Sequence, residues 1–538
     1  GVDRQARTPL VLLLSVTGLV LLIACANIAN LLLARSAARA GEMAVRLSIG
    51  ATRGQLIAQL LTESCLLAVC GGIAGVAVAR WTLDFIVAML PSDAASSLAF
   101  HIDTVAILFA AGLSIGTGVL FGLFPALHST RPDLVSALKG QAGQPSGARS
   151  AARFRLALAT MQIGLSMFLL VGAGLFTKSL MNVSRVDLGI KADNVITFAV
   201  SPELNGYKPA ASRALFERLE GDLGAVPGVT AVTTAIVPLL AGNNWGNNVT
   251  VEGFPAGPDT DTNSRYNEIG PSYFRGLGVP LLAGREFTAS DGATAPKVAI
   301  VNEAFAKKFN LGRNAVGKRM SQSSGKDAKL DIEIVGLAEN AKYSDVKDPT
   351  PPVFFIPYRQ DPTIGFMVFY VRTGLEPAQF FGTIRQVVAK ADPNLPIENL
   401  RTLPEQIRQN VFLDRMITTL SVSFAALATL LAAIGLYGVI AYTVSQRTRE
   451  IGLRMALGAA PARVRAMVMR QVAIMTAIGG VCGLVLAVWM GYAAQSLLYQ
   501  LQGWDPVVLA GAAAALTIVA LGAGIIPAHR ASRVDPML

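Results

Sequence analysis

Residues 172–179 are the part of the chain that comes nearest to a nucleotide-binding site. The string runs from Gly172 to Lys178 and Ser179, which resembles the glycine-rich loop that wraps phosphates and ends in Lys and Ser. Thr177 stands where that loop requires glycine, and the segment ends an apolar run expected to leave the membrane on the outer side. The string does not predict a nucleotide site, and the sequence offers no better candidate.

Two further patterns could support catalysis, and neither does so here. Gly112, Ser114 and Gly116 spell the nucleophile elbow of hydrolases, but they lie in an apolar run with no strand before them and no plausible triad. The three histidines are scattered too widely for zinc or for His-based catalysis. They are His101, His128 and His529. We therefore expect no catalytic residue, no metal and no cofactor in this chain, which is not predicted to be an enzyme.

A duplicated charged segment carries more information. Both copies read Arg-x-x-Glu-x-x-x-Arg-x-x-x-Gly-Ala, and every position of the second follows the first by 408 residues. The first copy comprises Arg39, Glu42, Arg46, Gly50 and Ala51, and the second comprises Arg447, Glu450, Arg454, Gly458 and Ala459. Glu four residues before Arg suits an ion pair on a helix, and Gly suits a left-handed cap. One copy could be an ordinary interfacial helix, whereas two with identical spacing predict a pair of helices that receive a push from a soluble partner.

The same repeat continues into the apolar runs that follow each charged segment. A glycine cluster recurs at the same offset of 408 residues, and the match then resumes at an offset of 402. The clusters are Gly71, Gly72 and Gly75, and Gly479, Gly480 and Gly483. Small residues allow helices to approach closely in lipid, so helix packing is favoured over a substrate path. Constant offsets over nearly a hundred residues predict a duplicated membrane unit.

Composition and apolar runs predict a polytopic α-helical membrane protein. Of 538 residues, 52% are hydrophobic and only 15% are charged. Seven stretches are long and apolar enough to span a bilayer. They are roughly 9–34, 56–80, 104–127, 156–176, 415–443, 466–490 and 507–527.

The distribution of basic residues orients these spans. Lys and Arg gather in the connections 35–55, 128–155 and 444–465, whereas 91–103 and 491–506 contain neither. Basic connections stay on the cytoplasmic side, which places the N-terminus outside and the C-terminus inside. The net charge of +11 is therefore explained by basic residues at the ends of membrane spans, beside the lipid bilayer. We expect no nucleic-acid partner.

With this orientation the chain divides into five parts. Residues 1–139 form a first membrane unit with three spans, 140–153 form a cytoplasmic linker, and 154–181 form the first span of a second unit. Residues 182–411 form a large extracytoplasmic domain, and 412–538 add the remaining three spans. Residue 1 is Gly rather than Met, so we expect the chain to begin inside a longer protein.

The extracytoplasmic domain has an α+β pattern with two similar halves. Strand-like runs flank a helical pattern in each half, which suggests a split ferredoxin-like unit. The first half comprises 194–200, 211–223 and 229–237, and the second comprises 353–357, 367–372, 377–391 and 395–400. Between them, about 240–345, lies an insertion with its own short strands at 249–252, 297–301 and 332–337.

These residues resemble the FtsX/MacB family of ABC-transporter permeases. The duplicated charged segments look like the family's coupling helix, and the external part, residues 182–411, looks like its periplasmic core domain, particularly between 273 and 303. The strings that carry the second likeness are Tyr273-Phe274-Arg275-Gly276-Leu277-Gly278-Val279, Gly284-Arg285 and Val301-Asn302-Glu303. Two membrane units in one chain are similar to the duplicated orphan permeases of this family, which have eight spans and two external domains. The resemblance implies that the first span and first external domain precede residue 1.

The resemblance also implies a function. Such a chain is a permease subunit in a bacterial inner membrane, working by mechanotransmission with a cytoplasmic ABC ATPase dimer that binds the ATP. One alternative is a signal transmitter that regulates an envelope enzyme or sensor, since one fold can serve both functions. A second is a membrane-anchored binding module without an ATPase. The substrate (hydrophobic drugs, peptides and lipoproteins are candidates) and the presence of a periplasmic adaptor stay open.

Overall fold

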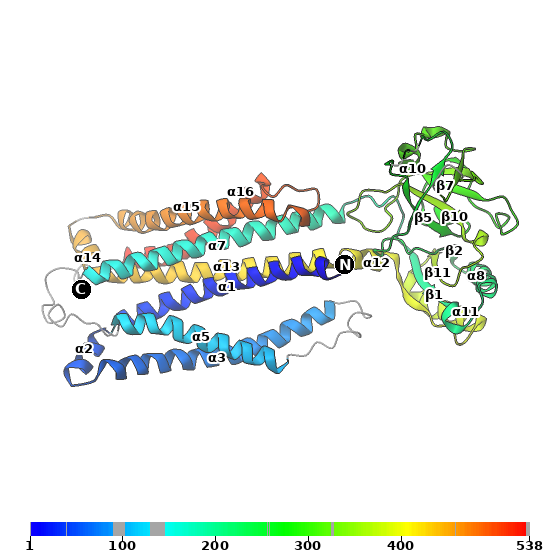
Figure 1. The fold of residues 1–538 in the computed structure, drawn as a ribbon. Coiled ribbons are helices and arrows are strands. Elements are labelled where there is room, and N and C mark those ends of the chain that lie inside the picture. Colours follow the sequence, from blue (N-terminus) through cyan, green and yellow to red (C-terminus); the bar gives the residue numbers. More distant parts are fainter. Residues whose placement is uncertain are drawn as a thin grey trace. The chain divides into compact units, whose positions relative to one another are not determined.

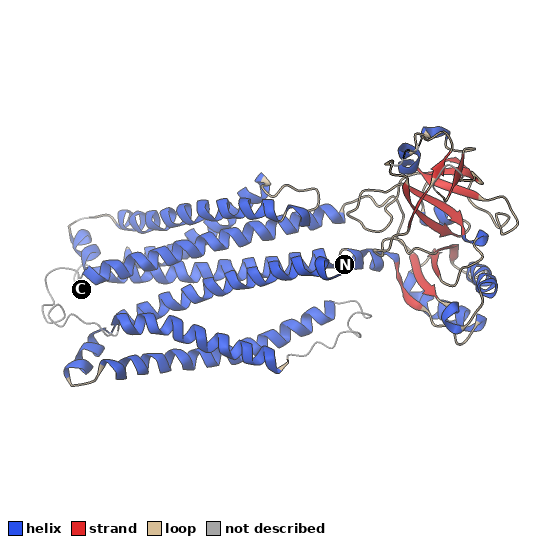
Figure 2. Cartoon of the chain, viewed as in Figure 1, coloured by secondary structure: helices blue, strands red, loops and turns tan. Residues whose placement is uncertain are grey.

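The computed structural model describes residues 2–533 apart from 39, 90–102, 130–145, 256, 258, 324–327 and 458. The chain forms two compact units, which Figures 1 and 2 draw. The helical unit comprises Gly1–Met181 and Asp414–Leu538, and the sheet unit comprises Asn182–Leu413. Each is described by itself below.

Long apolar helices make up the helical unit. They are α1 (Val2–Ala38), α3 (Arg53–Met89), α5 (Thr104–Ser129), α7 (Ser146–Ser184), α13 (Phe412–Gln446), α15 (Pro461–Ala493) and α16 (Pro506–Ala531), with the short helices α2 (Ala40–Ser48) and α14 (Thr448–Ala456) between them. Within the described residues, six helices are long and apolar enough to cross a membrane, and α5 contains the shorter apolar stretch Thr104–Leu120. A polytopic helical membrane protein with six to seven spans is confirmed.

The repeat in the sequence is also a repeat of structure. Helices α2 and α14 begin and end at positions separated by 408 residues, and α3 and α15 begin at the same offset. The bounds of α5 and α16 differ by 402 residues at both ends. Asp103 and Asp505 cap these two helices by accepting hydrogen bonds from the backbone N–H groups of Ala106 (2.7 Å) and Val508 (3.1 Å). The two copies of the membrane unit therefore share an aspartate that caps the N-terminus of their last helix, in addition to their apolar sequence pattern.

The helices pack around two apolar clusters. Helices α7, α13, α14, α15 and α16 contribute to the larger cluster, which includes Ile163, Met167, Leu436, Val472 and Leu516. The smaller cluster joins α1 to α7 and α13 through residues such as Ile23, Leu169 and Ala428. Helix α3 packs mainly on α5, and α5 also contacts α1.

The sheet unit contains a ferredoxin-like half built from β1 (Val195–Val200), α8 (Pro209–Gly224), β2 (Val229–Ala235), β11 (Met367–Thr373), α11 (Phe381–Ala391) and β12 (Glu398–Thr402). The strand order is β12-β1-β11-β2, and all three pairs are antiparallel, with an irregularity in the register of β1 against β12 and of β11 against β2. Alternate residues of β1 and β11, such as Phe198 and Phe369, pack against α8 and α11. This is the strand order of a split βαβ unit.

In the sequence, the second lobe lies between β2 and β11 of the ferredoxin-like half. Its strands are β3 (Gly246–Asn248), β4 (Thr250–Val251), β5 (Asn263–Ile269), β6 (Leu281–Gly284), β7 (Val298–Asn302), β8 (Arg319–Ser321), β9 (Ile332–Ala338) and β10 (Val353–Pro357). The short helices of the sheet unit include α9 (Tyr273–Leu277), α10 (Glu303–Lys308) and α12 (Leu403–Asn410). Figure 2 shows that the strands of the described part of the chain are gathered in this unit.

Three details differ from the sequence-based expectation. Strand β10 pairs with β5 and β7 of the second lobe and not with the ferredoxin-like half, because Phe354 packs into the apolar cluster of that lobe. Strand β12 begins at Glu398 rather than near Leu395. Helix α7 begins at Ser146, so 146–153 are helical where we expected a linker, and an Ala- and Arg-rich composition favours that helix. Residues 140–145 lie outside the described part.

Candidate functional site

The first charged segment forms helix α2, which connects α1 to α3. Arg46 donates a hydrogen bond to Glu42 one turn earlier, with 2.6 Å between Nη2 and Oε1. Its second amino group donates to Oε1 of Gln59, in the second turn of α3, at 2.8 Å. Arg46 therefore holds its own helix through Glu42 and holds the next long helix through Gln59.

The second segment repeats this arrangement in helix α14. Arg454 donates to Glu450 over 2.5 Å, and its other amino group lies 3.3 Å from the sulfur of Met467 in α15. Met467 follows Gln59 by the same 408 residues. The arginine thus donates to the equivalent position of the next long helix in both copies, although the acceptor in the second is the weakly accepting thioether sulfur of Met467.

The ends of both short helices are also alike. The backbone N–H of Ala51 donates to the carbonyl of Arg46, and that of Ala459 donates to the carbonyl of Arg454, each at 3.0 Å. Gly50 has φ +102, a conformation that glycine adopts without strain. Arg447 lies exposed at the N-cap of α14. Arg39 and Gly458 lie outside the described residues.

Figure 1 shows α2 and α14 at the same end of the helical unit. Helix α14 is anchored there through Ile451, whose side chain is 1% exposed and belongs to the larger apolar cluster. Both ion pairs remain half exposed, so they contribute only a few tenths of a kcal/mol each to stability. Accessible charges on anchored helices are suited to contact with a soluble protein.

A cluster of buried polar side chains lies between α1, α7 and α13. Asn27 of α1 donates to the carbonyl of Leu431 in α13 at 2.6 Å. Gln162 of α7 lies 3.3 Å from the carbonyl of Ile23 in α1, to which it donates. Ser166 of α7 donates to a carbonyl of α13 at 3.0 Å. Each pair of these three helices is therefore tied by a side chain-to-backbone hydrogen bond, of the kind worth roughly 0.6–2 kcal/mol inside a membrane.

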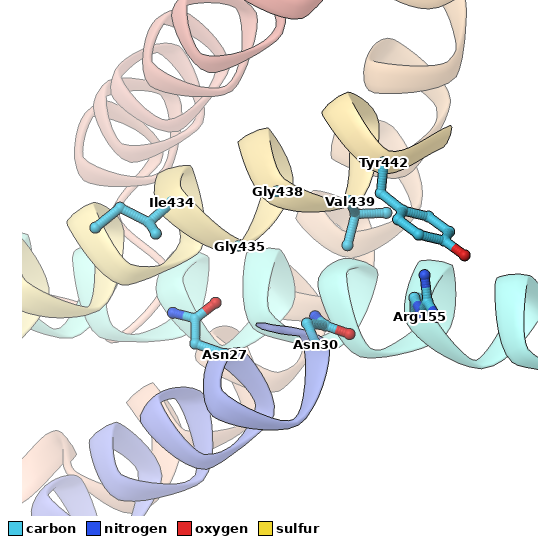
Figure 3. Close-up of a pocket in the computed structure, with 8 residues that line it drawn as sticks. All are labelled: Asn27, Asn30, Arg155, Ile434, Gly435, Gly438, Val439 and Tyr442. Atoms are coloured by element: carbon cyan, nitrogen blue, oxygen red, sulfur yellow. The ribbon is translucent and has the colours of Figure 1, made fainter. Parts of the chain in front are cut away.

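The same three helices enclose a cavity of about 30 Å³ toward the end that carries α2 and α14 (Figure 3). Asn30, Arg155 and Tyr442 line it, and the guanidinium of Arg155 lies 3.9 Å from the centre of the Tyr442 ring. Asn30 is 6% exposed, and neither its amide nitrogen nor its amide oxygen has a hydrogen-bond partner among the described residues. The cavity is large enough for one water molecule that could satisfy this amide.

This polar cluster was not among the sites expected from the sequence. A signal was available, since Asn27, Asn30 and Gln162 are amide side chains within apolar runs, where polar residues are rare and usually have a role. What the sequence could not supply was their convergence, because α1 and α13 are separated by several hundred residues.

The two predicted glycine clusters differ in their surroundings. In α15, Gly479 and Gly483 pack against α7 at Thr160 and Gly164, so that a Cβ on Gly479 would lie 2.6 Å from the Thr160 carbonyl. Gly480, also of α15, lies near Met167 of α7. In α3, Gly72 faces Ser114 of α5, whereas a Cβ on Gly71 or Gly75 would meet nothing within 4 Å among the described residues.

The residues of the nucleotide-site look-alike have structural contacts. Lys178 forms an ion pair of 2.7 Å with Asp505, the cap of α16. The hydroxyl of Ser179 accepts a hydrogen bond of 2.9 Å from the backbone of Tyr499. Within the described residues, no group of three or more His, Cys, Asp or Glu side chains is placed to hold a metal.

A large apolar cavity of about 680 Å³ lies between α1, α7, α13 and α15. Its walls include Leu19, Phe168, Leu169 and Met490. A volume and lining of this kind suit a hydrophobic molecule or an acyl chain.

Two family profiles match the chain. The profile described as FtsX-like permease C-terminal matches residues 14–134 and again 422–536, and the MacB-like periplasmic core domain matches 156–402. The paired match agrees with the duplication of the membrane unit.

Characterised and uncharacterised relatives are similar to parts of the chain. A probable export ATP-binding/permease protein MacB from Pseudomonas entomophila is 23% identical over 291 residues, covering 52% of this chain and 42% of that protein. The pyoverdine export ATP-binding/permease protein PvdT from Pseudomonas aeruginosa is 24% identical over 348 residues, covering 62% and 49%. The uncharacterized ABC transporter permease YknZ from Bacillus subtilis is 22% identical over 292 residues, covering 52% and 70%. The match thus spans less than half of the first two relatives.

Solved structures also align with this chain. The periplasmic region of MacB from Actinobacillus actinomycetemcomitans aligns at 15% identity with a TM-score of 0.29, covering 44% of this chain and 98% of that one. The extracellular domain of YknZ from Gram-positive bacteria aligns at 14% identity with a TM-score of 0.26, covering 38% and 100%.

Proposed function

This chain belongs to the FtsX/MacB family of ABC-transporter permeases, and on that premise we propose that it is the membrane subunit of a transporter that works by mechanotransmission. It is a multi-pass inner-membrane protein with a periplasmic domain. In the proposed cycle, a separate cytoplasmic ATPase dimer binds and hydrolyses ATP, and its closure moves helices α2 and α14. The long helices carry that movement to the periplasmic domain, which drives efflux or extraction of a substrate.

The observation that supports this proposal best is the matched geometry of α2 and α14. Both present a Glu–Arg pair at the same end of the helical unit, and both arginines reach the same position on the following long helix. Two equivalent contacts suit an ATPase dimer, because each subunit of a symmetric dimer offers the same docking surface.

The polar cluster supplies a route from these helices into the membrane. Helix α1 leads directly into α2, and α13 leads into α14. The hydrogen bonds of Asn27 and Ser166 tie α1 and α7 to α13, so that a displacement of one short helix is transmitted to all three long helices. This link is mechanical, through contacts with discrete alternative arrangements.

The large apolar cavity favours a hydrophobic substrate among the candidate classes. Phe168 and Met490 offer a surface without charge, and the cavity is large enough for a drug-sized molecule or part of an acyl chain. Replacing Leu169 by Trp should fill this space and lower transport of a hydrophobic substrate more than it lowers ATP hydrolysis.

The test of the proposal is the combined replacement of Glu42, Arg46, Glu450 and Arg454 by Ala. We expect the variant to fold and reach the membrane, and to lose both recovery of the ATPase in a pull-down and transport driven by ATP. Arg463, an exposed arginine in the first turn of α15, replaced by Ala is the charge control. Unchanged recovery and coupling in the fourfold variant would remove these residues from the mechanism.

The alternative of a signal transmitter is separated by a second readout. Reconstituted chain and ATPase that move no substrate, but change the activity of an envelope partner when ATP is added, would favour signalling over transport. A preparation that recovers no ATPase at all would favour a binding module.

A further inference from the structure

The two copies of the membrane unit differ in charge where α3 and α15 enter the membrane. In α15, Arg470 is exposed and has no ion pair or side-chain hydrogen bond within the described part of the chain. Its counterpart in α3, 408 residues earlier, is Thr62, which is also exposed but donates its hydroxyl to the carbonyl of Ala58 at 2.8 Å. The same position is therefore neutral and satisfied in the first copy, whereas it is charged in the second and has no described partner.

Arg470 lies close to the cytoplasmic boundary of the lipid. The periplasmic domain precedes α13, so α13 crosses the membrane inward and α15 starts on the cytoplasmic side. Helix α15 has 33 residues and is therefore roughly 50 Å long, whereas the hydrocarbon core is about 30 Å thick. A centred α15 extends about 10 Å beyond the core at each end, and Arg470 lies about 14 Å from the start of the helix. A side chain that reaches back toward Pro461 brings its guanidinium group to the level of the lipid headgroups.

Arg454 of α14 brings a second guanidinium group to the same face of α15. Its Nη1 lies 3.3 Å from the sulfur of Met467, which precedes Arg470 by three residues and therefore shares its side of the helix. Side chains of a helix lean toward its N-terminus, which takes Arg470 toward Met467 and Arg454. Glu450 neutralises one of the two charges through its ion pair of 2.5 Å with Arg454. Two arginines and one glutamate leave a net positive charge at this place.

An apolar stripe continues from this charge toward the middle of the membrane. The residues that follow Arg470 at helical spacing are exposed and uncharged. They are Ala473, Ile474, Ala477, Ile478 and Val481. Val481 lies roughly 16 Å along the helix from Arg470, which is about half the thickness of the hydrocarbon core. A molecule on this face meets cationic groups at the headgroup level and apolar groups over the depth of one leaflet.

We propose that this face of α15 binds an anionic phospholipid of the cytoplasmic leaflet, with its phosphate on Arg470 and Arg454 and an acyl chain along the apolar stripe. Guanidinium groups bind phosphate oxygens through paired N–H donors, and no described protein group takes the donors of Arg470. The net positive charge favours a lipid with a net negative charge, such as phosphatidylglycerol, over a zwitterionic lipid. The first copy lacks this site, because Gln59 and Thr62 occupy the positions of Met467 and Arg470.

The experiment is native mass spectrometry of the full-length protein, purified without an ATPase, delipidated in detergent and titrated with phosphatidylglycerol or phosphatidylcholine. Because no ATPase takes part, the result does not depend on the proposed function. Each variant carries the residue of the first copy: Arg470→Thr is the test, and Arg463→Gln is the matched control, since Gln55 is the counterpart of Arg463. Arg463 is exposed on the same helix, but it leans away from Met467 toward the start of α15.

We expect Arg470→Thr to lower the affinity for the first bound phosphatidylglycerol by about fivefold, the factor that corresponds to one arginine at an anionic membrane surface. Arg463→Gln should leave that affinity unchanged, and neither variant should alter binding of phosphatidylcholine. Equal losses in the two variants would overturn the inference. Equally tight binding of phosphatidylcholine and phosphatidylglycerol by the parent protein would overturn it as well, because the charge of Arg470 would then not select the lipid.

A competition separates a phospholipid site from a site for any phosphate. Inorganic phosphate and glycerol phosphate carry the anionic group without an acyl chain, so we expect neither to displace phosphatidylglycerol from the parent protein, even in large excess. Displacement by inorganic phosphate at a concentration equal to that of the lipid would show that the apolar stripe contributes nothing. That outcome would overturn the phospholipid as the occupant of this face.

Discussion

Arg46 and Gln59 join a short helix to the long helix that follows it, through a hydrogen bond of 2.8 Å between Nη1 and Oε1. In the second copy Arg454 points at the same position, but finds the sulfur of Met467. A hydrogen bond from a charged donor to an amide is stronger than a contact with a thioether. The two connections are therefore equivalent in place and unequal in strength, so that the first copy is the stiffer link.

This asymmetry predicts unequal effects of one substitution. Arg46→Lys removes the fork that binds Glu42 and Gln59 together, and we expect it to weaken coupling of ATP hydrolysis to transport more than Arg454→Lys does. Thermal stability should change by less than about 0.5 kcal/mol in either variant, because both ion pairs are half exposed. The measurement is the ratio of transport to ATP hydrolysis in vesicles. Equal ratios in the two variants would contradict the predicted asymmetry.

The polar cluster is packed closely against Gly435, so a larger residue at this position should destabilise the protein. A Cβ at this position would collide with Oδ1 of Asn27 and Oε1 of Gln162, which both point at it. Gly435→Ala should displace these amides, weaken their bonds to Leu431 and Ile23, and lower stability by about 1–2 kcal/mol. Gly438→Ala is the control, since a Cβ there meets nothing within 4 Å among the described residues. Unfolding of the purified protein in mixed detergent measures both, and similar losses would contradict the packing argument.

The parts of this fold that could be predicted from sequence are those set by local signals. Apolar runs define the spans, and a constant offset defines the repeat, because both are properties of the chain order alone. The strand-like runs around β1 and β11, each beside a helical pattern, likewise predicted strands there. The ion pairs of Arg46 and Arg454 follow from a spacing of four residues on a helix.

The parts that could not be predicted depend on which strands pair and which helix faces contact one another across long separations in the sequence. Strand β10 was assigned to the wrong lobe because its pairing with β5 and β7 joins residues far apart in the chain. The bond of Asn27 to Leu431 spans 404 residues, and the sequence pattern of α1 alone does not indicate its partner. The assignment of a coupling role to α2 and α14 stays a prediction until an ATPase is measured on them.

Two ion pairs of helix α8 in the periplasmic domain, one buried and one exposed, predict different losses of stability when their acidic residues are replaced. Glu220 of α8 binds Arg359 at 2.7 Å, with side chains 11% and 15% exposed, and burial raises the pKa of Glu220 in spite of the Arg359 charge. Glu220→Ala leaves the largely buried arginine with Glu217, at 3.6 Å, as its remaining carboxylate partner, and should cost about 1.5–3 kcal/mol. On the same helix, Arg218 and Asp222 form an exposed pair, and Asp222→Ala should cost below about 0.5 kcal/mol. Proteolysis of the intact protein at increasing urea concentration measures both, and comparable losses would refute the difference.

A buried carboxyl group makes the stability of the periplasmic domain depend on pH. Glu268 of β5 is 6% exposed; burial, followed by the neighbouring charge of Asp361, raises its pKa to about 8 from the usual 4.5. The folded domain therefore holds a proton that the unfolded chain releases above pH 4.5. The stabilisation from this group is fully present below pH 4.5 and is lost as pH rises to about 8, by up to ~1.4 kcal/mol per pH unit.

Glu268→Gln keeps the shape of the neutral acid and removes its titration. We expect the variant and the parent protein to have similar stability at pH 5, and the variant to become progressively more stable than the parent as the pH rises to 8. Urea-dependent proteolysis of the intact protein at pH 5, 6.5 and 8 checks this, with the exposed Glu376→Gln as the control that should follow the parent at every pH. A constant difference between Glu268→Gln and the parent over this range would mean that Glu268 does not titrate there.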